Sequence, residues 1–97
     1  MPDSVYTAMT GPRVRWDDEN TRHLLVERAD RWIAKREVEA VLMAPDTVRA
    51  VARSGRIRAT GRTAAGRCLI VIYAGIHDMR PVTAWETTGR EFERWQS

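Results

Sequence analysis

The sequence is poor in cysteine and histidine, and it has no long apolar run. Its one cysteine, Cys68, cannot form an internal disulfide, and it stands in the most apolar stretch, so we expect a buried thiol rather than a nucleophile. One cysteine and two histidines do not make a zinc site at any standard spacing, and we expect no metal and no cofactor. The longest apolar run, 68–74, is much shorter than the roughly 20 residues that cross a bilayer. We therefore expect no membrane association and a reducing, cytoplasmic location.

Acidic residues are absent from a long central interval. Between Asp46 and Asp78 lie six arginines and no acidic residue, although the net charge of the chain is only +3. Fifteen of the sixteen basic residues are arginine, whose planar guanidinium group matches phosphate oxygens and stacks on bases. A GC-rich genome would also raise the proportion of arginine relative to lysine, independently of function. The uneven distribution of charge predicts a surface for a polyanion such as RNA.

The length of 97 residues fits one domain. Residues 1–12 hold prolines, threonines and a glycine without the charged start and apolar core of a signal peptide, so we expect a flexible leader there. The single domain should then occupy residues 13–97.

The first half of this domain predicts a short strand at 13–16 followed by two helices. Asp17 or Asp18 should cap the first helix, and Pro45 should end the second. No glycine or proline separates them, and we expect the junction near residues 30–34. Helical spacing gives each helix one apolar face: Leu25, Ala29, Trp32 and Ile33 on the first, and Ala34, Val38, Val41 and Leu42 on the second.

The second half predicts strands. The second strand spans residues 47–63 and is split into 47–53 and 56–63 by the turn at Ser54-Gly55. The central strand spans residues 67–74, with Val71 and Ile72 in the core. The last strand spans residues 79–85. Thr88 opens a final helix with a capping box. The order is β-α-α-β-β-β-α, with the second strand split at the turn. This is an α+β fold in which a mostly antiparallel sheet packs on helices along one side.

Alternation along the strand at 56–63 separates arginines from apolar residues. Arg56, Arg58 and Arg62 should point to one side of the sheet, and Ile57 and Ala59 to the other. We therefore expect these three arginines to contact RNA phosphates. Arg90, in the final helix, is a further candidate for RNA binding.

Three segments, taken in order, resemble the BrnT family of type II toxins, which shares the RelE-like fold. They are VRWDDENTRHLL, KREVEAVLMAP, and ATGRTAAGRCLIVIY followed by DMRPVTAWETTGREFERW. The resemblance covers about residues 13–95 and implies a toxin that cleaves mRNA without a metal. It also implies a cognate antitoxin of the ribbon-helix-helix type, encoded by the adjacent gene, that covers the site.

Metal-independent cleavage, in which the 2′-hydroxyl attacks its own phosphate, needs a base, an acid and positive charge on the phosphorane oxygens. Arg67 and Arg80 match the arginines that flank the family's central strands, which implies a pair of phosphate clamps. The alternative is that both are ion-paired, for example with Glu86. If the two lie at opposite ends of their strands, Arg62 is the better partner for Arg67.

His23 and Glu86 are the candidate catalytic acid and base. A lone histidine on a helix is also a common surface or packing residue, and a carboxylate at position 86 could instead hold an arginine in place. Tyr73 and Trp85 could stack on a base, although alternation with Met79 could place Trp85 in the core. Trp16, Trp32 and Trp95 are predicted to be structural.

A second class of function is a basic module that binds RNA or an acidic protein partner without catalysis. Residues 27–32 read Glu-Arg-Ala-Asp-Arg-Trp, where the family has a basic residue followed by His-Gly. This departure favours the alternative. Growth arrest on induction, with rescue by the adjacent gene, would separate the two classes.

Overall fold

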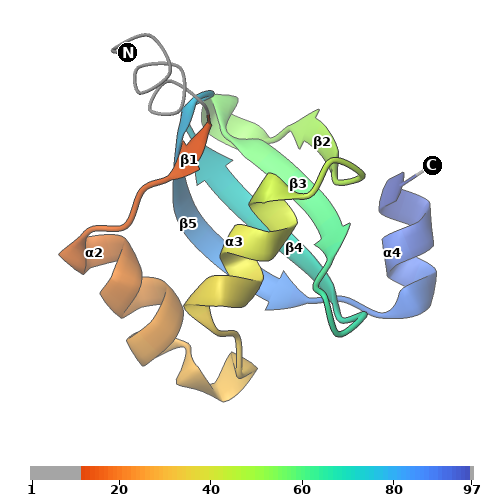
Figure 1. Cartoon of the computed structure of the whole chain (residues 1–97), viewed down its shortest axis with the longest axis horizontal. Coiled ribbons are helices and arrows are strands. Elements are labelled where there is room, and N and C mark those ends of the chain that lie inside the picture. The colour runs from red at the N-terminus through yellow and green to blue at the C-terminus, as the bar shows by residue number, and fades with distance from the viewer. Residues whose placement is uncertain (1–11, 97) are drawn as a thin grey trace, which may run out of the picture.

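The computed structural model describes residues 12–96, so the predicted leader lies outside the described residues except for Pro12. The helices are α2 (Asp18–Thr21), α3 (Lys35–Met43) and α4 (Gly89–Gln96) (Figure 1). Short helical turns are η1 (Arg22–Glu27), η2 (Ala29–Arg31) and η3 (Arg53–Gly55), and the strands are β1 (Arg13–Val14), β2 (Val48–Val51), β3 (Ile57–Arg62), β4 (Cys68–Ala74) and β5 (Asp78–Glu86).

The strands form one sheet in the order β1-β5-β4-β3-β2. Every pairing is antiparallel except that of β1, which runs parallel to β5. The predicted α+β class with a mostly antiparallel sheet is confirmed, as is the split of the second strand, because η3 separates β2 from β3. The parallel pairing of β1 with β5 was not predicted, since two residues carry too little periodicity to choose a partner.

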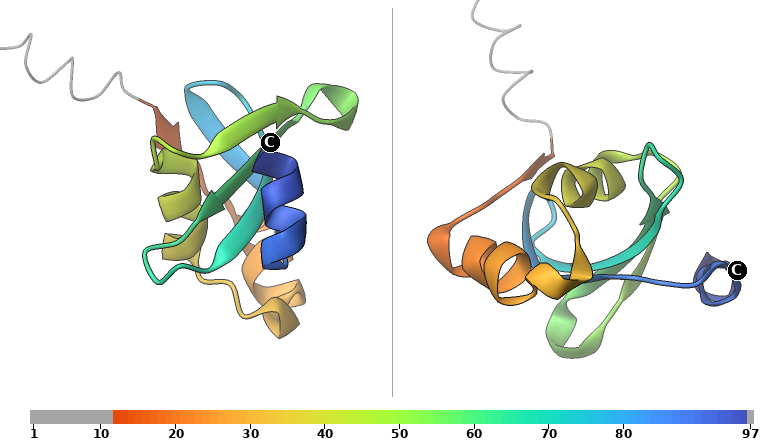
Figure 2. Two further views of the ribbon diagram at one scale, coloured as in Figure 1. Left: turned by 90° about the vertical axis from the view of Figure 1, so that its right-hand side faces the viewer. Right: turned by 90° about the horizontal axis from the view of Figure 1, so that it is seen from below.

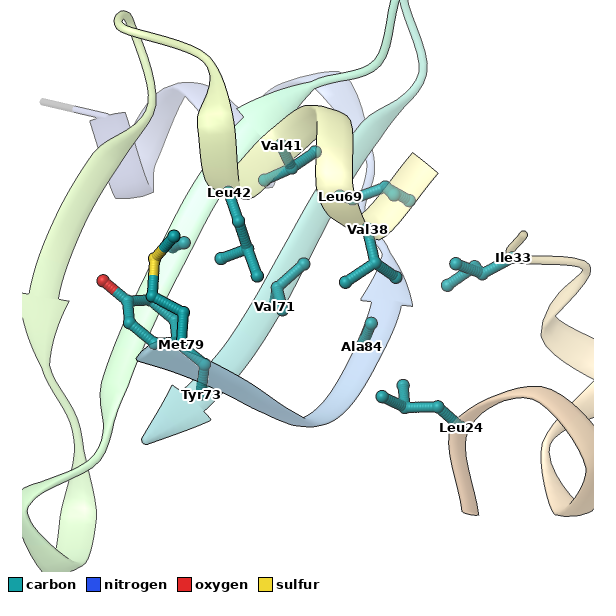
Figure 3. Close-up of a cluster of buried hydrophobic side chains, with 11 residues drawn as sticks. Leu24, Ile33, Val38, Val41, Leu42, Leu69, Val71, Tyr73, Met79 and Ala84 are labelled. Carbon is teal, nitrogen blue, oxygen red and sulfur yellow. The ribbon is translucent and has the colours of Figure 1, made fainter. Parts of the chain in front are cut away.

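The main core lies between α3 and one face of the sheet (Figure 3). Val38, Val41 and Leu42 of α3 meet Leu69 and Val71 of β4, and all five side chains are at most 1% exposed. This confirms the predicted apolar face of the second helix. Burial of Cys68 is also confirmed. Ile72, predicted to lie in the core, is only half-buried because it points to the other face.

The expectation that all helices lie on one side of the sheet is wrong. α4 packs on β3 and β4 from the face opposite α3 (Figure 2). Phe92 of α4 is 2% exposed, and Ile70, which points away from the α3 core, is 1% exposed. Thr88 Oγ1 accepts from Glu91 N at 3.2 Å, so the predicted cap of this helix is present. The Trp95 side chain, predicted to be structural, lies outside the described side chains.

The first helix is less regular than predicted. Asp17 caps it, but α2 passes into the π-helical turn η1 and the 3-10 turn η2. The change of helical pitch rotates the expected apolar face, so that Leu24 is buried at 3% exposure while Ala29 and Trp32 point to solvent. Trp16 does have the structural role predicted, because Nε1 donates to Glu39 Oε2 at 2.9 Å. No helix among residues 12–96 is long and apolar enough to cross a bilayer.

Candidate functional site

Arg67 lies between the β3–β4 turn and β4, and it is occupied by contacts within the protein. Nη1 lies 2.9 Å from Glu37 Oε1, and Nη2 lies 3.1 Å from Glu86 Oε1. The same two nitrogens donate to the carbonyl oxygens of Trp32 and Arg31 at 2.6 and 2.9 Å. Arg67 therefore joins the η2–α3 connection to the ends of two strands. Glu86 holds an arginine in place, which was the alternative to its role as a base.

The charges of this cluster stabilise one another. Burial by itself would raise the pKa of Glu37, but the backbone N–H of Ala34 and the guanidinium of Arg67 outweigh burial and lower it. Burial likewise opposes the charge of Arg67, and the carboxylates of Glu37 and Glu86 raise its pKa above the ordinary value. The two carboxylates within 3.1 Å therefore neutralise the positive charge of Arg67.

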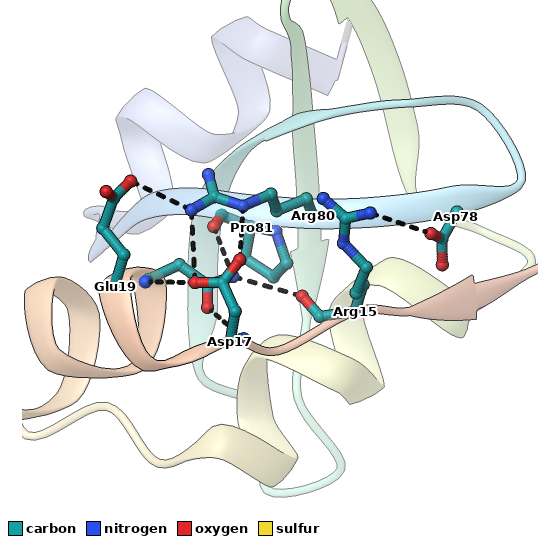
Figure 4. A network of polar contacts seen from close by, with 7 residues as sticks. Arg15, Asp17, Glu19, Asp78, Arg80 and Pro81 are labelled. Atoms are coloured by element: carbon teal, nitrogen blue, oxygen red, sulfur yellow. Dashed lines mark hydrogen bonds and ion pairs between the residues drawn. The ribbon is translucent and has the colours of Figure 1, made fainter.

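Arg80 is occupied in a comparable way at another part of the sheet (Figure 4). Its Nε donates to Asp17 Oδ2 at 2.7 Å, and its Nη2 lies 3.1 Å from Glu19 Oε1. The side-chain hydrogen bond to Arg80, helped by the backbone N–H of Asn20, lowers the pKa of Asp17 to about 2. The Asn20 side chain in turn donates to the carbonyl oxygen of Pro81 at 2.9 Å. Together these contacts fasten the start of α2 to β5.

We expect Asp17→Asn to weaken the fold in a pH-dependent way. Because the pKa of Asp17 falls from 3.8 to about 2 in the folded protein, its charge stabilises the fold above pH 4, and this contribution is lost as the pH falls towards 2. Asparagine is also a good helix cap, so the variant removes the ion pair and keeps the cap. The difference in melting temperature between wild type and variant should shrink from pH 6 to pH 2. A constant difference, or an equal one in the control Asp18→Asn, would contradict the assignment.

Arg67 and Arg80 do not share one site. Arg80 pairs with Ala74 at the end of β4, whereas Arg67 precedes the start of that strand. Seven residues at about 3.3 Å per residue separate these positions by roughly 23 Å. The proposed substitute, Arg62, lies across the turn from Arg67, but its guanidinium stacks on Phe92 at 4.7 Å on the α4 face, whereas Arg67 binds α3. The prediction that Arg67 shares a phosphate with Arg80 or with Arg62 is therefore wrong.

His23 lies in an open pocket of about 320 Å³ between α2–η1 and β5. Its Nδ1 is 3.5 Å from Glu27 Oε1, and Glu27 Oε2 is 3.3 Å from Arg22 Nε. The pocket therefore brings together two of the predicted catalytic residues, His23 and Arg80, with two that were missed. The i, i+4 spacing of His23 and Glu27 on one helix was a signal in the sequence that could have identified Glu27.

The arginines predicted to bind RNA differ from Arg67 and Arg80 in their surroundings. Arg56, Arg62 and Arg90 are exposed, and none of the three forms an ion pair with a carboxylate among residues 12–96. Arg58 is only half-buried on the same face of β3 as Arg62. The surface that this side of β3 offers to RNA is smaller than predicted, because α4 packs on it and Thr60 is only 1% exposed.

The two aromatic candidates for stacking lie on opposite faces. Tyr73 is 2% exposed, and its hydroxyl accepts from Arg49 Nη1 at 2.8 Å, so it cannot stack on a base. Trp85 pairs with Ile70 and is half-buried on the α4 face. A bulge in β5 beside Pro81 breaks the simple alternation with Met79 and moves Trp85 out of the core.

A second hollow, an apolar groove of about 430 Å³, lies at the end of α3 and beside the β4–β5 turn. Arg49 is its one charged lining residue, and its guanidinium binds two neutral oxygens, those of Tyr73 and Leu42. Met43 and Ile76 line the groove and are 51% and 76% exposed. The groove thus offers apolar surface with one positive charge that no carboxylate in the described residues pairs with.

Comparisons with protein-family models, curated proteins and solved structures found no match to this chain. Among residues 12–96, no group of three or more His, Cys, Asp or Glu side chains is placed to hold a metal ion.

Proposed function

We propose that the protein is a RelE-like toxin of a type II toxin–antitoxin module, which binds RNA in the cytoplasm and cleaves mRNA without a metal. One observation carries the RNA-binding part. The guanidinium groups of Arg56, Arg62 and Arg90 are exposed and form no ion pair among residues 12–96, whereas those of Arg67 and Arg80 are neutralised. Unpaired arginines on the surface are the groups that bind RNA phosphates and release the counterions condensed on them.

The length of β3 suits a single strand of RNA. Arg56 precedes the strand and Arg62 ends it, so about six residues at roughly 3.3 Å per residue separate them by about 20 Å. Arg90 follows β5, which ends near the start of β4 beside Arg62. A single strand running along this side would meet several cations in succession.

Salt dependence tests this proposal. Three to five phosphate contacts imply a slope of log affinity against log salt of roughly −2 to −3.5 for single-stranded RNA. We expect Arg56→Gln/Arg62→Gln to reduce the magnitude of the slope by about 1.4. Arg13→Gln is the matched control, because Arg13 is 71% exposed but ion-paired with Asp78. A slope near zero in wild type, or an equal reduction in the control, would remove the RNA-binding proposal.

The pocket with His23 supplies the groups for cleavage. The 2′-hydroxyl must lose a proton as it attacks the phosphorus, and the leaving 5′-oxygen must gain one. We assign the first transfer to His23, with Glu27 directing its Nδ1, so that Nε2 takes the proton of the 2′-hydroxyl. The leaving 5′-oxygen takes its proton from solvent water, which reaches this open pocket. Arg22 is 67% exposed and pairs with Glu27 through its Nε, which leaves its two Nη groups for phosphate oxygens. Arg80 positions Asp17 and Glu19. Because cations and carboxylates balance in this pocket, affinity for RNA must come from the arginines along β3.

The apolar groove is the proposed docking site of the antitoxin. Its lining suits an apolar segment that carries one carboxylate, which would pair with Arg49. We expect Ile76→Asp to leave growth arrest intact and to abolish rescue by the neighbouring gene, because it places a negative charge at the groove. Val26→Asp is the control, since Val26 is 65% exposed on η1, away from the groove. Equal loss of rescue in the control would contradict this placement.

A further inference from the structure

Trp32, between η2 and α3, combines exposure with an unusual backbone. Its side chain is 83% exposed, the highest value among the large hydrophobic residues described. Its backbone is left-handed, with φ 55° and ψ 40°. A residue other than glycine adopts this conformation at a cost in free energy, and such positions cluster at functional sites. Packing does not account for the indole, because little of it is buried.

The surrounding structure enforces this conformation. Arg67 donates to the carbonyl oxygens of Trp32 and Arg31, and the carboxylates of Glu37 and Glu86 fix its guanidinium on both sides. The Trp32 N–H also donates to Ala29 O at 3.1 Å. The backbone that carries the indole is therefore held from several directions, and the ring is presented to solvent.

Cations flank Trp32 in the sequence. Arg31, Lys35 and Arg36 lie within four residues of it, and none of them forms an ion pair among residues 12–96. Arg31 donates to Ala84 O on β5 and Lys35 Nζ lies over the Trp16 ring, so the exposed Arg36 is the flanking cation that remains for a phosphate. The nearest carboxylate in sequence on α3, Glu37, is taken up by Arg67. The contacts of Arg67 also place Trp32 at the end of the sheet where β3 ends and β4 begins, the end that carries Arg62 (Figure 1).

We propose that Trp32 is a stacking platform for a base of single-stranded RNA, with Arg36 on a neighbouring phosphate and Arg67 as the positioning residue. The inference rests on the proposed RNA binding and adds a contact that the arginines of β3 do not supply. An indole stacks on any base, because every base has a flat π-face. A protein partner is the weaker fit. Of the other exposed large hydrophobic residues, Met43, Val51 and Ile76 lie away from the η2–α3 connection, Val26 on η1 is a single small side chain, and charged side chains flank the indole.

The test uses a fluorescein-labelled oligouridylate of about 12 nucleotides, a site size typical for single-strand binders. We expect Trp32→Ala to lower its affinity roughly 5- to 150-fold, the loss of one base stack. Trp32→Phe keeps an aromatic face and should retain most of the affinity. Val26→Ala, which trims another exposed apolar side chain, should bind like wild type. Unlabelled oligouridylate should quench tryptophan fluorescence in wild type and much less in Trp32→Phe.

Four outcomes overturn the inference. Wild-type affinity in Trp32→Ala, combined with the expected loss in Arg56→Gln/Arg62→Gln, would remove the stacking role and keep the proposed RNA binding. Unchanged RNA affinity with altered sedimentation of Trp32→Ala would assign the indole to contacts between copies of the chain. A lower melting temperature in Trp32→Gly would assign it to packing, because glycine relieves the left-handed strain and should raise the melting temperature. Absence of any RNA binding in wild type would remove both proposals together.

Discussion

Arg67→Ala is expected to lower the free energy of unfolding by about 2–3 kcal/mol. Breaking a fully buried ion pair at one partner costs about 3–5 kcal/mol, and we reduce this value because the side chains of Arg67 and Glu37 are 21% and 19% exposed. The variant leaves the Glu37 carboxylate without its cation and frees the carbonyl oxygens of Arg31 and Trp32. The expected loss is one of stability, which replaces the expectation that Arg67 only binds phosphate.

Urea denaturation measures this effect directly. Arg90→Ala is the matched control, because Arg90 is exposed and forms no ion pair among residues 12–96, and its unfolding should change by less than about 0.5 kcal/mol. Glu37→Ala should share much of the loss, and the double variant should lose less than the sum of the two, since both changes break one interaction. Equal midpoints for Arg67→Ala and Arg90→Ala would contradict the structural role.

His23→Ala should slow RNA cleavage by roughly 100- to 10,000-fold, because a positioned acid or base usually accelerates a reaction by that factor. The fold should survive, because the His23 side chain is 49% exposed and its contact with Glu27 lies at the surface. Single-turnover cleavage of a labelled RNA, with a chelator present throughout, gives the rate. The chelator belongs in the assay because the proposed mechanism uses no metal.

His77→Ala is the matched control for this experiment. His77 is the other histidine of the chain and is exposed in the turn between β4 and β5. It should cleave at the wild-type rate. Equal rates in the two variants would remove His23 from the mechanism. Loss of wild-type cleavage on adding the chelator would contradict the metal-independent reaction. In either case RNA binding by the arginines would stand, and cleavage would have to come from other groups or from a metal. Absence of cleavage by wild type itself would leave a module that binds RNA without cutting.

Local patterns predicted the elements that bury one regular face. The spacing of Val38, Val41 and Leu42 indicated α3 correctly, and the apolar run that begins at Cys68 indicated the central strand. Alternation placed Arg58 and Arg62 on the side of β3 away from the α3 core. These predictions hold because period and burial are local properties of a helix or strand.

The errors arose where a local irregularity changed the direction of later side chains. A π-helical turn turned Trp32 outward, and a bulge beside Pro81 moved Trp85 to the other face. The side of the sheet that α4 covers was likewise undetermined, because its sequence fixes an apolar face but not which surface receives it. Such irregularities depend on which element packs next to them, and the sequence pattern does not contain that information.

The sequence by itself determined the α+β class, the split strand, the buried thiol and the concentration of arginine between Asp46 and Asp78. Only the tertiary structure decided which arginines keep an available charge. Arg67 and Arg80 are neutralised by carboxylates far from them in the sequence, at positions 37, 86, 17 and 19, whereas Arg56 and Arg62 meet none among the described residues. The physical reason is that an arginine's charge is set by the groups within a few ångströms, and folding alone chooses those neighbours.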